Sequence, residues 1–219
     1  MRLKKRQSLN WRLYAITCPD RLKGRDLAAL AEAAIRGGAD VLQLRNKTAS
    51  DKEFLAEAKV LRSLTHHMGV PLIVNDRLQL ARECGADGVH LGQDDGTLVQ
   101  ARQLLGENAL IGRSTHSAEQ ALAAEREGFD YIGVGPVYAT PTKPGRAAVG
   151  LELVRFASKN IKIPFVAIGG IDENNIYEVL KAGAKCVAVV RSLMGSDNPG
   201  EAAQTLIRKM ENRINTHDK

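Results

Sequence analysis

The chain alternates between short apolar runs and amphipathic segments along nearly its whole length. Leucine and alanine recur between the runs at helical spacing, as in Leu27, Leu30 and Ala34. Strands that are apolar on both faces are typical of a parallel sheet covered by helices. Strands are expected at 13–17, 41–45, 71–75, 88–92, 110–114, 131–135, 165–169 and 186–190. Helices are expected at 27–35, 54–64, 78–84, 98–105, 118–127, 151–158, 173–182 and 199–212.

Eight strand–helix units in one chain predict the α/β class and a closed (β/α)8 TIM barrel. The barrel is expected to be a single domain over residues 13–215, with no linker and no second domain. A doubly wound open sheet is the alternative fold. The glycine spacing of a dinucleotide-binding sheet is missing after the first predicted strand, which favours the barrel.

The excess of positive charge lies at the N-terminus. The formal net charge is +6, and residues 1–12 carry five of these charges and no acid, on Arg2, Lys4, Lys5, Arg6 and Arg12. Nucleic-acid-binding proteins carry a basic face with interleaved aromatic side chains, not only a short basic segment. We therefore expect residues 1–12 to form a flexible arm and expect no nucleic-acid partner.

No apolar run reaches the length of a membrane span, and the N-terminus lacks the apolar core of a signal peptide. The three cysteines, Cys18, Cys84 and Cys186, are too far apart for a disulfide framework or a zinc motif. These features predict a cytoplasmic protein that does not bind a membrane. The oligomeric state is left open, with a homodimer as one option.

A short phrase recurs before every second predicted strand. It reads Gly-Ala-Asp at 38–40 and 85–87, Gly-Phe-Asp at 128–130 and Gly-Ala-Lys at 183–185. These phrases lie at the amino ends of the strands, which is the face of a barrel that serves stability. We interpret them as helix stops followed by strand entries.

The carboxyl ends of the strands carry polar residues, as expected for the active face of a barrel. One set is cationic or hydroxyl-bearing and suits phosphate oxygens: Arg45, Lys47, Thr140, Thr142 and Lys143. Asp76 and Asp95 follow neighbouring strands, and two carboxylates with phosphate oxygens and water commonly hold Mg²⁺. For Asp95 the alternative is an N-cap of the helix at 98–105, and Asp94 is expected in the first turn of that helix.

A second phosphate site is predicted where the last two strands end. Gly169-Gly170 and Val190-Arg191-Ser192 lie there, and the loops after strands 7 and 8 of such barrels cradle phosphate with backbone N–H groups. Two phosphorylated small molecules, one with a magnesium-bound pyrophosphate, suggest a transferase that expels pyrophosphate.

The histidines give a weaker signal. His90 lies inside a predicted strand and is expected to be a packed or hydrogen-bonded core residue. His116 follows another strand and is the one histidine suited to acid–base chemistry, although it could simply precede the next helix.

Several motifs in order make the chain resemble the thiamine phosphate synthase family over about residues 13–195. They are Gln43-Leu44-Arg45-x-Lys47, Asn75-Asp76, residues 88–95, residues 114–116, residues 133–143 and residues 167–171. The resemblance implies that an aminopyrimidine methyl pyrophosphate is joined to a thiazole phosphate, giving thiamine phosphate and pyrophosphate. It also implies a dissociative reaction assisted by Mg²⁺ without a covalent nucleophile.

The resemblance assigns roles to the predicted residues. Gln43 and Asn75 would hold the pyrimidine, Asp76 and Asp95 would bind Mg²⁺, and Gly170, Val190 and Arg191 would bind the thiazole phosphate. The pyrophosphate would be held by residues that also act in catalysis: Arg45, Lys47, Ser114 and Lys143. Thr140 and Thr142 would line the thiazole and pyrophosphate region. The chain departs from the family pattern at Asn46, where an acid is common, and at Arg191, where a serine is frequent.

Two rival functions remain at this stage. A related thiazole tautomerase would use His116 to move a proton, but it has no need of a magnesium pair or of a pyrophosphate grip. A non-catalytic sensor of a thiamine precursor would bind its ligand without turnover.

Overall fold

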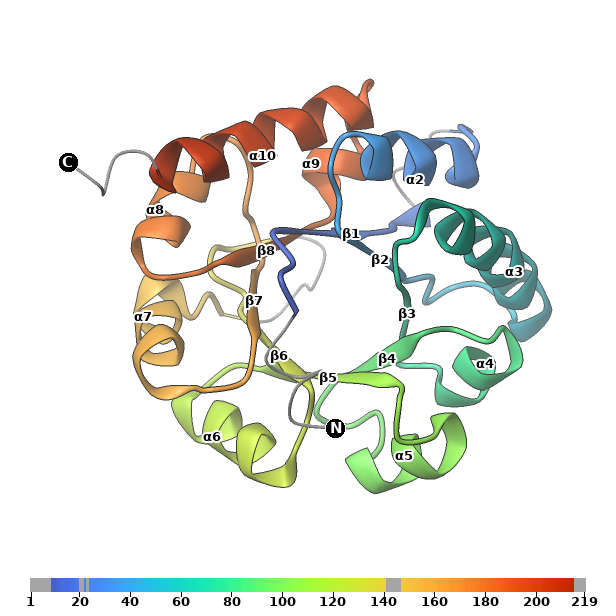
Figure 1. Ribbon diagram of the computed structural model, residues 1–219, viewed down its shortest axis with the longest axis horizontal. Coiled ribbons are helices and arrows are strands. Elements are labelled where there is room, and N and C mark those ends of the chain that lie inside the picture. Colours follow the sequence, from blue (N-terminus) through green and yellow to red (C-terminus); the bar gives the residue numbers. More distant parts are fainter. Residues whose placement is uncertain (1–8, 20–21, 23, 141–146, 215–219) are drawn as a thin grey trace.

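A computed structural model describes residues 9–19, 22, 24–140 and 147–214 of the chain. In this part of the chain, parallel strands close into a barrel in the order β1-β2-β3-β4-β5-β6-β7-β8, and β1 pairs with β8 (Figure 1). The strands are β1 Leu13–Ile16, β2 Val41–Leu44, β3 Leu72–Asn75, β4 Gly88–Leu91, β5 Leu110–Thr115, β6 Tyr131–Val134, β7 Phe165–Ile168 and β8 Cys186–Val189. The predicted barrel is confirmed, and the open-sheet alternative is excluded.

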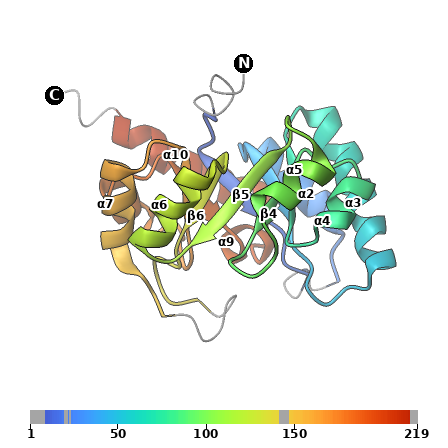
Figure 2. The ribbon, with the colours of Figure 1, turned by 90° about the horizontal axis from the view of Figure 1, so that it is seen from below.

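Helices surround the barrel on its outside (Figures 1 and 2). They are α2 Leu27–Arg36, α3 Asp51–Met68, α4 Leu78–Glu83, α5 Leu98–Leu105, α6 Ala118–Glu127, α7 Gly150–Asn160, α8 Ile176–Lys181, α9 Arg191–Met194 and α10 Pro199–Ile214. Their ends follow the local chemistry of the sequence. The predicted cap of α6 is confirmed, because the Ser117 side chain accepts from the N–H of Gln120, and Gly69 ends α3 in a left-handed conformation.

The core has two parts. Apolar faces of the helices pack against the outside of the barrel, with side chains such as Leu42, Phe54 and Ile111 fully buried. A smaller cluster fills the inside of the barrel and includes Tyr14, Tyr131 and Cys186, so the predicted burial of Cys186 is confirmed. The inside of the barrel is therefore filled with side chains below the site at its carboxyl end.

Residues 9–12, the last part of the segment expected to be a flexible arm, contact the barrel. Residues 1–8 lie outside the described residues, but Trp11 packs edge-on against Tyr14 and Tyr131, with ring centroids 5.7 and 5.3 Å away. Arg12 pairs with Glu211 of α10 at 3.0 Å. Residues 9–12 thus belong to the barrel, because the chain crosses its amino end on the way into β1.

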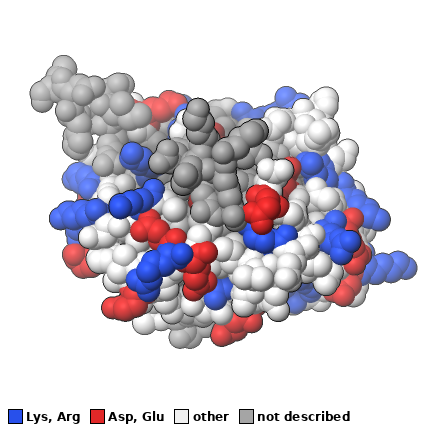
Figure 3. Space-filling model, turned by 60° about the horizontal axis from the view of Figure 1, so that its bottom comes forward, with Lys and Arg blue, Asp and Glu red and all other residues white. Residues whose placement is uncertain are grey.

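The surface carries charges of both signs. On the side of the molecule that is at the bottom of Figure 1, basic and acidic side chains alternate over short distances (Figure 3). Among the described helices, none combines the length and the apolar character that a membrane span requires.

Candidate active site

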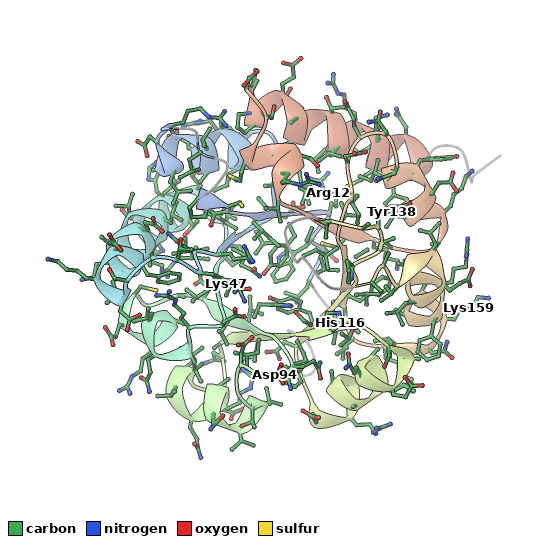
Figure 4. All side chains as sticks on the ribbon, turned by 180° about the vertical axis from the view of Figure 1, so that it is seen from behind. Arg12, Lys47, Asp94, His116, Tyr138 and Lys159 are labelled. Carbon is green, nitrogen blue, oxygen red and sulfur yellow. The ribbon has the colours of Figure 1, made fainter. Side chains whose placement is uncertain are left out.

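A cavity opens at the carboxyl end of the barrel, where the sequence predicts the active face. Of the predicted residues, Gln43, Arg45, Asn75, Ser114, Thr140, Gly170, Val190 and Arg191 line it. Figure 4 looks onto this end, with Lys47, His116 and Tyr138 placed around the barrel axis. Thr142 and Lys143 lie outside the described residues, so their predicted roles are not tested by this geometry.

Asp76, Asp95 and Lys47 form a charged cluster at the rim. The Lys47 Nζ atom lies 3.1 Å from Oδ2 of Asp76. Burial, followed by the neighbouring Asp95 carboxylate, raises the pKa of Asp76 above its usual value, and Lys47 opposes this shift. Asp76 also has a φ of 60°, a left-handed conformation that aspartate adopts far less often than glycine does. The backbone thus holds one carboxylate against another, an arrangement that a cation would relieve.

The donor set of this rim fits magnesium. Among the described residues no three histidine, cysteine or acidic side chains gather as a complete metal site. Two carboxylates alone suit Mg²⁺, which commonly takes its other ligands from substrate phosphates and water. The Asp76–Asp95 pair would therefore supply part of a magnesium site, and a phosphorylated substrate would supply the rest.

In the loop after β4, the alternative role of Asp95 as a helix cap is excluded, and the expected place of Asp94 in the first turn of the helix is wrong. Thr97, not Asp95, caps α5, because its side chain accepts from the N–H of Gln100. Asp95 Oδ2 instead accepts from the N–H of Gly92 at 2.9 Å, which folds the loop back toward β4. Asp94 lies in the turn before the helix and not in its first turn, since α5 begins at Leu98.

The loop after β2 is held by local hydrogen bonds. The N–H of Arg45 donates to Thr17 Oγ1 at 2.9 Å, which ties the strand end to β1. Asn46 donates to the Glu57 carboxylate at 3.1 and 3.0 Å, and its own Oδ1 accepts from the N–H of Ala49 at 3.1 Å. An asparagine at this position fits the loop, since it needs an amide that can both donate and accept.

The other side of the cavity is formed largely by backbone. Gly169 and Gly170 have φ values of 105° and 65°, and an added Cβ would lie 2.5 Å from Pro136 Cα and 2.7 Å from Tyr138 Cβ. The two glycines therefore let the segment after β6 pack directly on the segment after β7.

The sequence reading missed α9, which begins immediately after Val190 and starts with Arg191. Ser192 fixes this short helix by donating to the carbonyl of Ile171 at 2.9 Å. The signal for α9 in the sequence was the apolar pair Leu193-Met194 followed by Gly195. The structure buries both apolar side chains and ends the helix at this glycine. A short extra helix after the last strand is a common phosphate-binding device of such barrels.

Two histidines line the cavity. His116 precedes α6, and its Nδ1 lies 2.5 Å from the carbonyl oxygen of Gly135, so Nδ1–H donates there. His90 is hydrogen-bonded, as expected, but it is only partly buried and borders the cavity, so it is not purely a core residue.

Tyr14 and Tyr131 also line the cavity, and the sequence reading did not single them out. Their signal was a tyrosine in each of two otherwise aliphatic strands. A buried phenol needs a hydrogen-bond partner, and inside a barrel such partners come from other strands.

Comparison with known proteins places the chain in a family. Residues 13–193 match the family model for thiamine monophosphate synthase. A thiamine-phosphate synthase of Chloroflexus aurantiacus is 48% identical over 199 residues, which cover 90% of this chain and 92% of the relative. One from Nostoc punctiforme is 53% identical over 211 residues, or 95% of this chain. The chain spans only 59% of that relative's length.

The fold comparison agrees. The structure of a thiamine phosphate pyrophosphorylase from Pyrococcus furiosus has a TM-score of 0.84 and 37% sequence identity, and the match covers 95% of this chain and 98% of that one. The matched region contains the cavity and the acidic rim. The chain therefore belongs to the thiamine monophosphate synthase family.

Proposed function

We propose that the protein is a thiamine-phosphate synthase. It joins an aminopyrimidine methyl pyrophosphate to a thiazole phosphate and releases pyrophosphate. The observation that carries the proposal is the Lys47–Asp76–Asp95 cluster beside a cavity whose opposite side is formed by Gly169, Gly170 and α9. An acidic pair with a cation suits a metal-bound pyrophosphate, and a glycine-rich backbone suits a second phosphate.

Asp76 and Asp95 would hold Mg²⁺ together with pyrophosphate oxygens. When bound, the ion would neutralise charge that develops on the leaving pyrophosphate. Arg45 and Lys47 lie on the same side, and they add positive charge to that group. Thr142 and Lys143 are proposed to act with them on the sequence pattern alone.

The bond that breaks joins the pyrimidine methylene carbon to the pyrophosphate oxygen, and the oxygen keeps the electron pair. The electron-rich aminopyrimidine stabilises the methylene cation, and the thiazole nitrogen supplies the electron pair of the new carbon–nitrogen bond. The thiazole nitrogen replaces the pyrophosphate oxygen on the methylene carbon, so no covalent enzyme intermediate is needed. The chain's residues position the two rings and stabilise the departing charge.

His116 supports a second candidate, a thiazole tautomerase. Its Nδ1–H is held by the carbonyl of Gly135, so a proton exchange with a ligand would have to use Nε2. The charged rim has no role in such a reaction, so the synthase is the better account. A cytoplasmic location, and a homodimer as one option for the assembly, stay predictions.

Pyrophosphate release tests the proposal. The purified protein is given the pyrimidine pyrophosphate and the thiazole phosphate, each alone and together, with Mg²⁺ or with excess chelator. Release that requires both substrates and Mg²⁺ supports the synthase. Absence of release, with proton exchange on the thiazole that His116→Ala removes, would support the tautomerase, and ligand binding without either reaction would support a sensor.

A further inference from the structure

A chain of hydrogen bonds crosses the inside of the barrel and connects two residues of the cavity. Gln43 Nε2 donates to the Tyr14 hydroxyl at 2.8 Å, and this hydroxyl lies 3.0 Å from that of Tyr131. The Tyr131 hydroxyl lies 3.2 Å from Nδ1 of His90, and Nε2 of His90 lies 3.0 Å from Oγ of Ser114. Gln43 is on β2 and Ser114 is on β5, so this series of hydrogen bonds, called the relay below, spans the barrel.

The sequence makes room for these rings. A Cβ at Gly112 would lie 2.2 Å from Tyr131 Cζ and 2.6 Å from His90 Nδ1, and one at Gly133 would lie 3.2 Å from His90 Cε1. Trp11 packs edge-on against both tyrosines from the amino end. The rings are therefore confined by strand glycines on one side and by an aromatic ring on another, which leaves little freedom to rearrange.

The hydrogen bonds of the relay all run in one donor-to-acceptor direction, from Gln43 to Ser114. Tyr14 accepts from Gln43, and its other hydrogen-bond partner among the described residues is Tyr131, so its one hydrogen is donated to Tyr131. Tyr131 then donates to Nδ1 of His90, and a neutral imidazole with Nδ1 as acceptor carries its proton on Nε2. That proton is donated to Ser114 Oγ, which leaves the serine hydrogen for the cavity. Burial raises the pKa of both tyrosines far above the usual value, so both phenols keep their hydrogen.

We propose that Tyr14, Tyr131 and His90 are positioning residues that fix Gln43 Oε1 as an acceptor and the Ser114 hydroxyl as a donor. The inference rests on the proposed function. The amino group on the pyrimidine can only donate usefully to Gln43, and pyrophosphate oxygens can only accept from Ser114. If every hydrogen bond in the relay were reversed, Gln43 would present a donor and Ser114 an acceptor to the substrate. The relay therefore couples recognition of the amino group to binding of the pyrophosphate.

The consequence is selectivity for an amino-substituted ring. A ring that carries an oxo group in place of the amino group presents an acceptor to Gln43 Oε1, and the buried relay opposes the amide flip that would accommodate it. A site built around a fixed hydrogen-bonding group rejects the wrong partner strongly, since a buried polar group is left unpaired.

The test compares the amino and oxo forms of the pyrimidine pyrophosphate. We expect the wild type to favour the amino form by at least about tenfold in kcat/KM, and Tyr131→Phe to reduce this preference to about threefold or less. Phenylalanine keeps the ring that packs on Trp11 and removes only the hydroxyl. The KM for the thiazole phosphate should stay within about twofold of wild type, whereas that for the pyrimidine should rise about tenfold.

Tyr177→Phe is the matched control, because Tyr177 is an exposed tyrosine on α8. It should leave the preference and both KM values at the wild-type level. An unchanged amino preference in Tyr131→Phe, or an equal rise in both KM values, would overturn the proposal.

A second measurement does not depend on turnover. In ¹⁵N-histidine spectra of the unliganded protein at about pH 8.5, where an ordinary imidazole is neutral, His90 should carry its proton on Nε2. His90→Gln identifies the signal, and Tyr131→Phe should give a mixture of tautomers. A proton on Nδ1 in the wild type would overturn the relay. If the wild type forms no product from either ring, the proposed function fails, and the histidine spectrum still decides the hydrogen-bond direction.

Discussion

Acidic residues at the two ends of the barrel differ in their hydrogen bonds and ion pairs. At the amino end, Asp40, Asp87 and Asp130 precede β2, β4 and β6, and each accepts from the backbone N–H of the neighbouring odd-numbered strand. Each also pairs with an arginine. At the carboxyl end, Asp76 faces Asp95 and has one lysine beside it.

The difference lies in how fully each carboxylate is satisfied. An amino-end aspartate closes the gap at the start of a strand pair and has a positive partner, so its charge is paired within the protein. In the Asp76–Asp95 pair, two carboxylates are set against one ion pair, with Lys47, in the part of the chain that the structure describes. Acids of the first kind stabilise the fold, and acids of the second kind are suited to a cation that arrives with substrate.

The largest effect is expected at the most buried amino-end acid. The side chains of Asp130 and Arg102 are 8% and 7% exposed, and Asp130 Oδ2 lies 2.5 Å from an Arg102 nitrogen and 2.8 Å from the Ile111 nitrogen. Asp130→Ala leaves a buried arginine without its carboxylate, which should cost about 3–5 kcal/mol of unfolding free energy. Urea unfolding measures the loss.

Two comparisons sharpen that result. Asp51→Ala removes an exposed partner of Arg77 and should cost less than about 1 kcal/mol. At low temperature, the folded fraction of Asp130→Ala should keep wild-type KM values. A loss of activity that exceeds the loss of folded protein would show that the amino end also shapes the site.

At the carboxyl end the expected loss is in activity. Asp76→Asn should lower kcat/KM for Mg²⁺-dependent pyrophosphate release by about 100-fold or more, because it removes a charge that is proposed to hold the metal. Asparagine tolerates the left-handed backbone of Asp76, so the melting temperature should not fall. Asp76→Ala should lose the same activity and about 1 kcal/mol of stability besides.

The assignment of Asp95 over Asp94 is tested in the same assay. Both side chains are exposed, but Asp95 contributes to the raised pKa of Asp76, whereas Asp94 is not among the causes of that shift. Asp95→Asn should match Asp76→Asn, and Asp94→Asn should have a much smaller effect. Equal losses at both positions would count against the proposed pair.

A smaller effect is expected at a less buried amino-end acid. Asp87 accepts from the Leu72 N–H at 2.8 Å and pairs with Arg62 at 3.1 Å, but both side chains are partly exposed. Water can replace much of what Asp87→Ala removes, so the cost should be about 1–2 kcal/mol. Unfolding free energies that did not follow the burial of Asp130 and Asp87 would contradict this account of the amino end.

The sequence predicted the barrel because its signals are local. Apolar runs, helical spacing and terminal glycines such as Gly69 act within a few residues, and each agreed with the others. The recurring Gly-Ala-Asp phrases were also recognised, but their acids were interpreted only as part of strand entries. Their contacts reach the neighbouring strand, so they become visible only when the strands are paired. Before β7 the acid comes from elsewhere, since Glu125 of α6 accepts from the Lys162 and Ile163 N–H groups.

The sequence predicted those parts of the site that consist of individual polar residues at the ends of strands. Gln43, Asn75 and Ser114 line the cavity as expected. The Tyr14–Tyr131–His90 relay was not predicted, because it joins side chains from β1, β6 and β4 across the barrel interior. Such contacts depend on which side of each strand faces inward and on the stagger of the closed barrel, and neither is given by residue spacing.

The smallest expected effect concerns the pH dependence of the carboxyl-end pair. A carboxyl group whose pKa is raised on folding adds stability at low pH, and this contribution is lost as the pH rises through the raised value. Without metal, the wild type should therefore lose stability relative to Asp76→Asn as the pH rises above the usual aspartate pKa. Saturating Mg²⁺ with pyrophosphate should reduce this stability difference, because the proposed site would bind the ion through the ionised wild-type carboxylate and not through the amide. The measurement is the unfolding free energy of both proteins across pH, and the sign of the change in their difference decides the prediction. A wild type that gains on Asp76→Asn with rising pH would mean that Lys47 already balances the pair, and the contrast between the two ends of the barrel would then fail at this residue.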